Sequence, residues 1–159
     1  MDREPELLAP DLGYALVRDR TAQGSVAYAF GELDLSTASA FESFLLDTAA
    51  GPWPVVAELS ECRFIDASIV SVLIRVRDGL GDAFRIVAPR TSCARRLLGI
   101  LDLIEPLGVH ETQRSAFAGG RPQTNVVDLQ FRPHAGRDRR RANRSLSPLG
   151  RDRRAWNRA

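Results

Sequence analysis

The chain has 159 residues, of which 44% are hydrophobic, and its formal net charge is +2. A chain of this length can bury one sizeable core, so we expect a single folded domain. The sequence has no apolar run of the roughly 18 to 20 residues that a membrane span needs, and its acidic start lacks the basic and apolar regions of a secretory signal. These features predict a cytoplasmic protein with no membrane partner.

Charge is distributed unevenly along the chain. Residues 1–119 carry 11 arginines against 17 acidic residues, whereas residues 120–159 carry 11 arginines against three aspartates. The last forty residues also lack a helical or strand period, so we expect a basic, disordered tail that occupies residues 113–159. Such a tail can contact nucleic acid, because arginine is an effective phosphate partner, or it can be a solvated extension without a dedicated partner.

The first elements of the domain follow from periodicity. Residues 13–19 and 25–33 have strand-like patterns and are separated by a short polar turn, which predicts a β-hairpin. Ser36 is then the expected N-cap of a helix, which ends at the GPWP sequence of residues 51–54. The apolar positions of this helix are expected to bury Phe41, Phe44, Leu45 and Thr48.

Strands and helices continue to alternate along the second half of the domain. Buried strands are predicted at residues 54–59 and 83–88, with a helix from about Ser68 to Leu80 between them. A third helix, capped by Thr91 or Ser92, precedes a short strand near Val109. Its apolar stripe consists of Ala94, Leu97, Leu98 and Leu101.

This alternation predicts an α/β fold in which helices flank a mixed β-sheet. We expect the domain to span residues 11–112, after a flexible N-terminal segment of residues 1–10. The helix at 68–80 should turn five residues toward the core: Ile69, Val72, Leu73, Val76 and Leu80.

The sequence gives little support for catalysis. It has neither a GxSxG nucleophile elbow nor a phosphate-cradling motif, and its two histidines, His110 and His134, do not adjoin a nucleophile and a carboxylate. Glu32 and Asp34 point to the same side of a strand end, where a solvated role is favoured over an acid–base pair. Cys62 and Cys93 are expected to be buried or half-buried thiols. We therefore expect a non-enzymatic protein without a cofactor or metal site.

Three segments in order resemble the STAS domain of bacterial anti-sigma factor antagonists. They are GELDLSTASAFESFL, VVAELSECRFIDASIVSVLIRVRD and RIVAPRTSCARRLLGILDLIEPLGV, and the resemblance covers residues 11–112. It implies a STAS-like mixed sheet flanked by helices and a function in partner switching. In that family the antagonist binds an anti-sigma factor, usually a GHKL-type serine kinase, and so frees a sigma factor for transcription.

The resemblance also implies a regulatory site. The kinase phosphorylates the family's antagonists on the serine or threonine directly after a loop aspartate, which breaks the complex. Here that aspartate is Asp66, but the acceptor position is Ala67, which has no hydroxyl, and Ser68 lies one residue further on. Ser68 is therefore either a displaced phosphorylation site or the N-cap of the helix, and the cap is favoured. Asp66 either stabilises the helix start or positions a hydroxyl and partner.

A candidate partner surface extends from this site along the helix. Its candidate residues are Asp34, Asp66, Ala67, Ser68, Val70 and Ile74. Val70 and Ile74 either flank the core or form an exposed apolar strip for docking, and Arg75 and Arg77 are expected to be solvated. The alternative to partner switching is a non-switching STAS scaffold or sensory subunit of a regulatory complex. The sigma factor, the stimulus and the oligomeric state are not specified by the sequence.

Overall fold

The computed structural model describes residues 13–119. The expectations for the N-terminal segment 1–10, for His134 and for the tail beyond residue 119 lie outside these residues. No helix within the described range combines the length and the apolar character that would let it cross a membrane.

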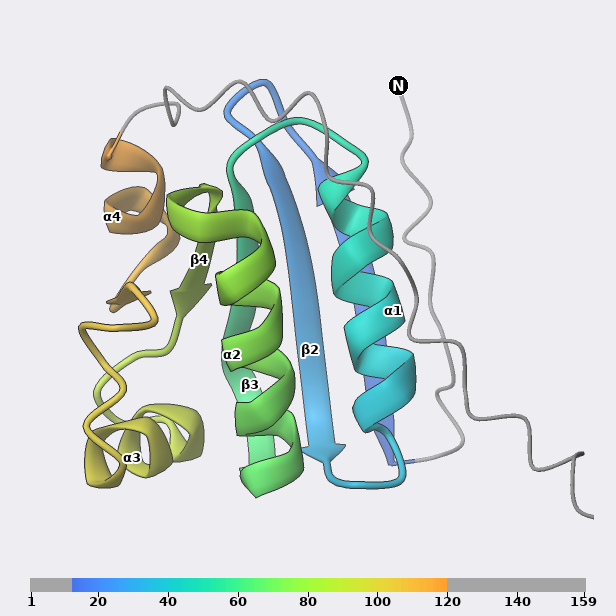
Figure 1. The fold of residues 1–159 in the computed structure, drawn as a ribbon, viewed down its shortest axis with the longest axis vertical. Helices are drawn as coiled ribbons and strands as arrows, with labels where there is room; N and C mark the ends of the chain where they lie inside the picture. The colour runs from blue at the N-terminus through green and yellow to red at the C-terminus, as the bar shows by residue number, and fades with distance from the viewer. Residues whose placement is uncertain (1–12, 120–159) are drawn as a thin grey trace, which may run out of the picture. The chain divides into compact units, whose positions relative to one another are not determined.

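Strands and helices alternate along the described chain after an initial hairpin (Figure 1). The elements are β1 (Tyr14–Arg20), β2 (Ser25–Leu33), α1 (Ala38–Ala49), β3 (Val55–Ile65), α2 (Ala67–Leu80), the 3-10 turn η2 (Gly81–Ala83), β4 (Phe84–Val87), α3 (Cys93–Ile100), β5 (Val109–His110) and α4 (Gln113–Ala118). The predicted α/β fold is confirmed.

The five strands form one sheet in the order β1-β2-β3-β4-β5. β1 and β2 pair antiparallel as the predicted hairpin, and the remaining neighbours pair parallel. Two irregularities in the β2–β3 register, between Tyr28 and Phe30 and between Gly31 and Glu32, allow the longer β3 to pair with β2. The sheet is therefore mixed, with its antiparallel pair at one edge.

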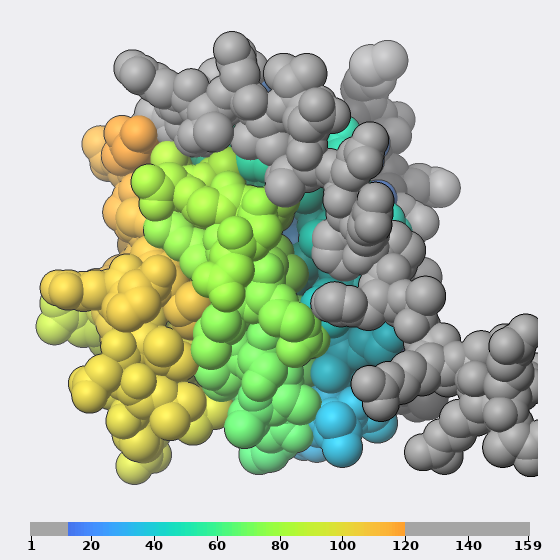
Figure 2. Space-filling model, viewed as in Figure 1, coloured from blue at the N-terminus to red at the C-terminus, as the bar shows by residue number. Residues whose placement is uncertain are grey.

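One face of the sheet carries the main core. α1 and α2 lie side by side across this face, as Figures 1 and 2 show. The predicted apolar faces of both helices are confirmed, because all of their core residues are buried. Arg75 on α2 donates to Glu42 on α1 through two hydrogen bonds of 2.8 Å, so this arginine joins the two helices as well as meeting solvent.

The opposite face carries a smaller cluster under α4. Val26, Val56 and Val87 pack there with Ala116, and Phe117 lies against them. Glu58, which is 7% exposed, accepts a hydrogen bond of 2.8 Å from Gln113 at the start of α4. A buried carboxylate needs such a partner to offset the loss of water.

Several local expectations are wrong. Thr37, whose side chain makes no capping hydrogen bond to the first turn, occupies the N-cap position of α1 that was predicted for Ser36. The last predicted core residue of α3, Leu101, is 45% exposed, because the helix ends at Ile100. Arg77 is not simply solvated, because it donates to the Phe84 carbonyl and forms an ion pair with Asp82.

The domain also extends beyond residue 112, its expected end. Residues 113–118, which the sequence assigned to the tail, form α4, and Ala116 within it is fully buried. Thr112 and Ser115 bond reciprocally in a capping box that starts this helix. Arg85 on β4 donates to the Ala116 carbonyl near its end.

Gly31 tests the close approach of β2 to the residue that precedes β1. Its φ is +79°, and a Cβ at this position would lie 2.2 Å from the backbone oxygen of Gly13. Gly31→Ala should therefore lower the free energy of unfolding by about 2 kcal/mol or more. Urea denaturation measures this loss.

Gly79→Ala is the matched control. Gly79 lies within α2, and an added Cβ would meet no atom within 4 Å. The same substitution should raise the free energy of unfolding by up to about 1 kcal/mol, because alanine favours the helix. Equal effects of the two substitutions would contradict the role given to Gly31.

Candidate functional site

The candidate site is centred on Asp66, between β3 and α2. Asp66 has extended backbone angles and is the N-cap of α2. Its Oδ1 atom accepts hydrogen bonds from the backbone N–H groups of Ser68 (2.9 Å) and Ile69 (3.2 Å) and from the Ser68 hydroxyl. The structure therefore supports helix-start stabilisation as the structural role of Asp66.

Ser68 is not the N-cap that the sequence favoured. It is the second residue of α2, and its hydroxyl donates to Asp66 instead of accepting from a backbone amide. The cap is Asp66 because its carboxylate reaches the free N–H groups of the first turn. Ser68 is half-buried, whereas Ala67 at the expected acceptor position is exposed.

A second loop lies against this helix start. The backbone N–H of Leu35, in the loop between β2 and α1, donates to the Asp66 Oδ2 atom at 3.1 Å. Within the same loop, Asp34 Oδ1 accepts from the backbone N–H and the hydroxyl of Ser36, at 2.9 Å and 2.6 Å. The ends of β2 and β3 are thus joined through one carboxylate, which brings the predicted residues Asp34, Asp66, Ala67 and Ser68 together.

The two carboxylates favour their ionised forms. A hydrogen bond from the Ser36 side chain, followed by weaker contributions from backbone N–H groups, lowers the pKa of Asp34. For Asp66, desolvation raises the pKa, but the hydrogen bonds from the Ser68 side chain and from the backbone N–H groups of Ile69, Ser68 and Leu35 together lower it. The site therefore presents negative charge at neutral pH.

The remaining predicted surface residues lie deeper than expected. Val70 is 4% exposed and belongs to the core, so it is not available for docking. It lies on the side of α2 that turns toward the rest of the core cluster. Ile74 is half-buried and packs against the same core. Of the two alternatives for these residues, the structure supports packing at the core and contradicts an exposed docking strip at Val70.

Two exposed apolar residues supply the surface instead. Leu35, whose backbone bonds Asp66, is 77% exposed, and Phe64, two residues before Asp66, is 49% exposed. Sequence reasoning missed both residues. The sequence did contain two signals. Leu35 lies between two polar turn residues, and Phe64 breaks the pattern of buried positions near the end of β3. Together they place one apolar side chain on the loop after β2 and one near the end of β3.

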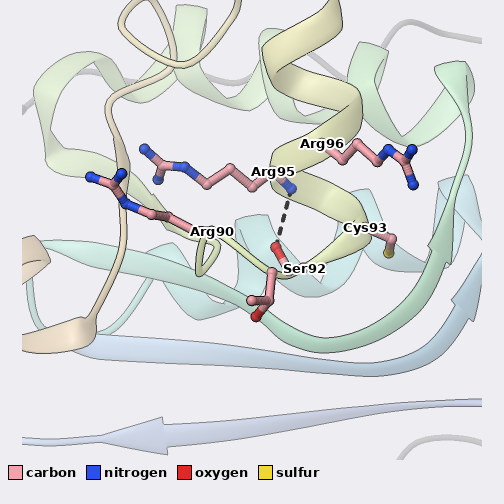
Figure 3. A pocket seen from close by; sticks show the side chains of 6 residues that line it. Arg90, Ser92, Cys93, Arg95 and Arg96 are labelled. Atoms are coloured by element: carbon pink, nitrogen blue, oxygen red, sulfur yellow. Dashed lines mark hydrogen bonds between the residues drawn. The ribbon is translucent and has the colours of Figure 1, made fainter.

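A different concave region lies at the start of α3. Its volume is about 500 Å³, and its lining includes Arg90, Ser92, Cys93, Arg95 and Arg96. In Figure 3, Arg90 and Arg95 lie to one side of the helix start, while Cys93 and Arg96 project to the other. Ser92 caps the helix, as one of the two predicted candidates, by accepting from the Arg95 N–H at 3.1 Å. The arginines do not converge on one point.

The arginines of this region are also partly engaged. Glu111 forms ion pairs with Arg90 at 2.6 Å and with Arg95 at 3.8 Å. Among residues 13–119, no group of three or more histidine, cysteine, aspartate or glutamate side chains could hold a metal ion. The Asp66 site therefore remains the stronger candidate, as a surface for protein binding.

The two cysteines lie as expected, buried at Cys62 and half-buried at Cys93. Desolvation, with smaller contributions from nearby Cys93, Glu58 and Glu61, raises the pKa of Cys62 to about 12. The Cys62 thiol donates to the Ala29 carbonyl at 3.3 Å. A thiol held protonated in this way is a poor nucleophile.

Removal of the Asp66 cap should destabilise the domain. Asp66→Ala removes the acceptor of the hydrogen bonds from Leu35, Ser68 and Ile69. It should lower the free energy of unfolding by about 0.5 to 2 kcal/mol at neutral pH. Because the folded-state pKa is lowered from 3.8, the stabilisation is complete above that value and is lost as the pH falls through the folded-state pKa. Urea denaturation at neutral and at acidic pH should therefore show that the difference in unfolding free energy between Asp66→Ala and the wild type becomes smaller in acid.

Ser68→Ala is the control for this measurement. It removes one hydroxyl donor and leaves the backbone bonds to Asp66 intact, so it should cost less than Asp66→Ala. A greater loss in Ser68→Ala would show that the hydroxyl, not the aspartate cap, stabilises the helix start.

Comparison with known proteins was made for sequence and for structure. Neither a protein-family model nor a curated protein matches the sequence. The structure is similar to that of an anti-sigma factor antagonist from Mycobacterium paratuberculosis, with 26% identity and a TM-score of 0.60, over 70% of this chain and 96% of that chain. It is also similar to a candidate anti-sigma factor antagonist from Thermotoga maritima, with 18% identity and a TM-score of 0.52, over 64% of this chain and 91% of that one. The second similarity concerns the fold alone.

Proposed function

We propose that this chain, which has the STAS-domain fold of anti-sigma factor antagonists, binds an anti-sigma factor and thereby frees a sigma factor for transcription. The observation that carries the proposal is the pair of exposed apolar side chains, Leu35 in the loop after β2 and Phe64 near the end of β3, on the two chain segments that Asp66 joins. Burying such side chains against a partner is favourable, and both segments are held in place before binding.

The same site also supports a proposal about regulation. In the related antagonists a kinase-type anti-sigma factor phosphorylates the residue after the loop aspartate, which here is Ala67. Ala67 is exposed but has no hydroxyl, and the nearby Ser68 hydroxyl is bonded to Asp66. We propose that this antagonist binds its partner persistently, because phosphorylation at the usual position cannot release it.

A non-switching scaffold or sensory subunit is the second candidate function. The alanine at position 67 favours it, because a scaffold needs no phosphate acceptor. Both functions lack a chemical step catalysed by this chain. They differ in whether the bound protein is an anti-sigma factor that sequesters a sigma factor.

Leu35 and Phe64 provide the binding test. The full chain should bind the anti-sigma factor encoded in the same genome, and Leu35→Ser or Phe64→Ser should weaken binding by about tenfold or more, as expected for a lost buried apolar contact of at least 1.4 kcal/mol. Titration calorimetry gives the dissociation constants of the wild type and of each variant. Ile100→Ser is the matched control, because Ile100 on α3 is 72% exposed and lies outside the site.

The outcomes separate the candidate functions. Binding that is weakened by the site variants and unchanged by Ile100→Ser supports the antagonist. A complex that forms but does not release a sigma factor from the anti-sigma factor in a competition assay would favour the scaffold. Equal loss in all three variants would contradict the assignment of the surface.

Ala67→Ser tests the regulation. With a kinase-type anti-sigma factor and ATP, this variant should acquire one phosphate and dissociate from its partner, while the wild-type complex persists. The N-terminus of α2 tolerates the phosphate in the free protein, but its added charge of about −2 opposes docking. Intact-mass spectrometry and size-exclusion chromatography after incubation measure the two events.

Ser68→Ala distinguishes a displaced acceptor. Stoichiometric phosphate on wild-type Ser68 that disappears in Ser68→Ala would mean that the acceptor has moved by one residue. The persistent complex proposed above would then be wrong, although binding to the anti-sigma factor would stand.

A further inference from the structure

The face of the sheet opposite α1 and α2 has two differently covered parts. α4 contacts β3, β4 and β5 and covers the valine cluster on those strands and on the start of β2. The part formed by β1 and the end of β2 lies beyond these contacts. Tyr28 lies at its border, because it packs against the valine cluster and its hydroxyl oxygen accepts a hydrogen bond of 3.2 Å from Gln113 on α4. One end of this part adjoins the Asp66 site, because Glu32 pairs with Phe64 in the β2–β3 register, but the two sets of residues do not overlap.

We call this part the open strip and define it by strand alternation and register. Leu16, Ala27 and Ala29 belong to the core under the helices, so the residues between and beside them face the other way. The register places Ala15 opposite Phe30, Val17 opposite Tyr28, and Phe30 opposite Glu61. The open strip consists of Ala15, Val17, Tyr28, Phe30, Glu32 and Glu61.

Two aromatic rings and two carboxylates lie next to one another on the open strip. The rings of Tyr28 and Phe30 are stacked, with centroids 6.4 Å apart and planes inclined by 20°. Glu61 lies opposite Phe30, and Glu32 lies two residues further along the same strand and so on the same side. Both glutamates are exposed, and within residues 13–119 neither carboxylate has a hydrogen-bond or ion-pair partner. Ala15 and Val17 supply a flat apolar floor beside the rings.

We propose that the open strip binds an extended, arginine-rich peptide of a partner protein. A guanidinium group can stack on an aromatic ring and form two hydrogen bonds with a carboxylate, so it matches both chemical features of the strip. In an extended peptide, side chains on one face recur about every 6.6 Å, which matches the two-residue spacing of Tyr28, Phe30 and Glu32.

The chain uses the same chemistry on its other face. The Arg18 guanidinium lies 5.0 Å from the ring centroid of Phe44, and Arg75 binds both carboxylate oxygens of Glu42. A purely apolar partner fits less well, because it would remove two carboxylates from water without supplying a partner. Charge complementarity therefore favours a basic occupant.

The test uses the full chain and two fluorescein-labelled probes, octa-arginine and octa-lysine. Octa-arginine should bind at least about fivefold more tightly than octa-lysine, because lysine has the charge but not the planar group that stacks. Binding is measured by fluorescence anisotropy. Nuclear magnetic resonance should show the largest amide shifts at Ala15, Val17 and Phe30. Failure of octa-arginine to bind counts against the proposal.

Two variants with matched charge locate the site. Glu32→Gln with Glu61→Gln should weaken octa-arginine binding by about tenfold, as loss of two charge-assisted contacts predicts. Asp78→Asn with Glu105→Gln removes the same charge from exposed positions outside the strip and should change binding by less than about twofold. Phe30→Leu keeps an apolar side chain but should remove the preference for arginine over lysine.

Three results would overturn the proposal. One is equal weakening by the two charge variants, which would indicate attraction by net charge alone. Another is the location of the amide shifts at the Asp66 site or at α3. The third is a shift of the strip amides with protein concentration in the absence of probe, which would identify a second copy of the chain as the occupant.

Discussion

The organisation of the candidate site depends on the carboxylate of Asp66. One oxygen satisfies backbone N–H groups at the start of α2, and the other accepts from Leu35 in the neighbouring loop. A carboxylate is suited to both tasks because it accepts several hydrogen bonds and its charge is favoured at a helix N-terminus. The interaction fixes the ends of two parallel strands at the same edge of the sheet. An apolar surface on mobile loops would have to be ordered on binding, whereas this one is already held.

The same carboxylate limits how the site can be regulated. The hydroxyl of Ser68 donates to Asp66, so it would have to leave this hydrogen bond of the helix cap before it could accept a phosphoryl group from a donor. The exposed residue beside it, Ala67, offers no group to modify. In the proposed function, binding and release would therefore depend on different residues, and a chain could keep binding while it lacks release.

Most of the fold could be predicted because its elements bury one clear face each. The hairpin, α1 and the core face of α2 follow from apolar periodicity alone. β3 was predicted only to residue 59, although it continues to Ile65, because Ser60, Glu61 and Arg63 interrupt its apolar run and the register irregularities accommodate such residues. α4 was missed because a six-residue helix has too few turns to show a period.

The site was less predictable than the fold. The motif located Asp66, but periodicity could not separate a cap from a residue that donates to it, since Asp66 and Ser68 are both good capping residues. Val70 was placed at the edge of the helical face, where the packing of neighbouring elements decides exposure. The contribution of Leu35 depends on a hydrogen bond between loops 31 residues apart, which no local pattern contains.

The order of the strands has a separate consequence for synthesis of the chain. Because β1 to β5 are neighbours in space as they are in sequence, each strand that leaves the ribosome finds the edge on which it pairs already made. The sheet can grow in the direction of translation, without waiting for a later strand to insert between two earlier ones.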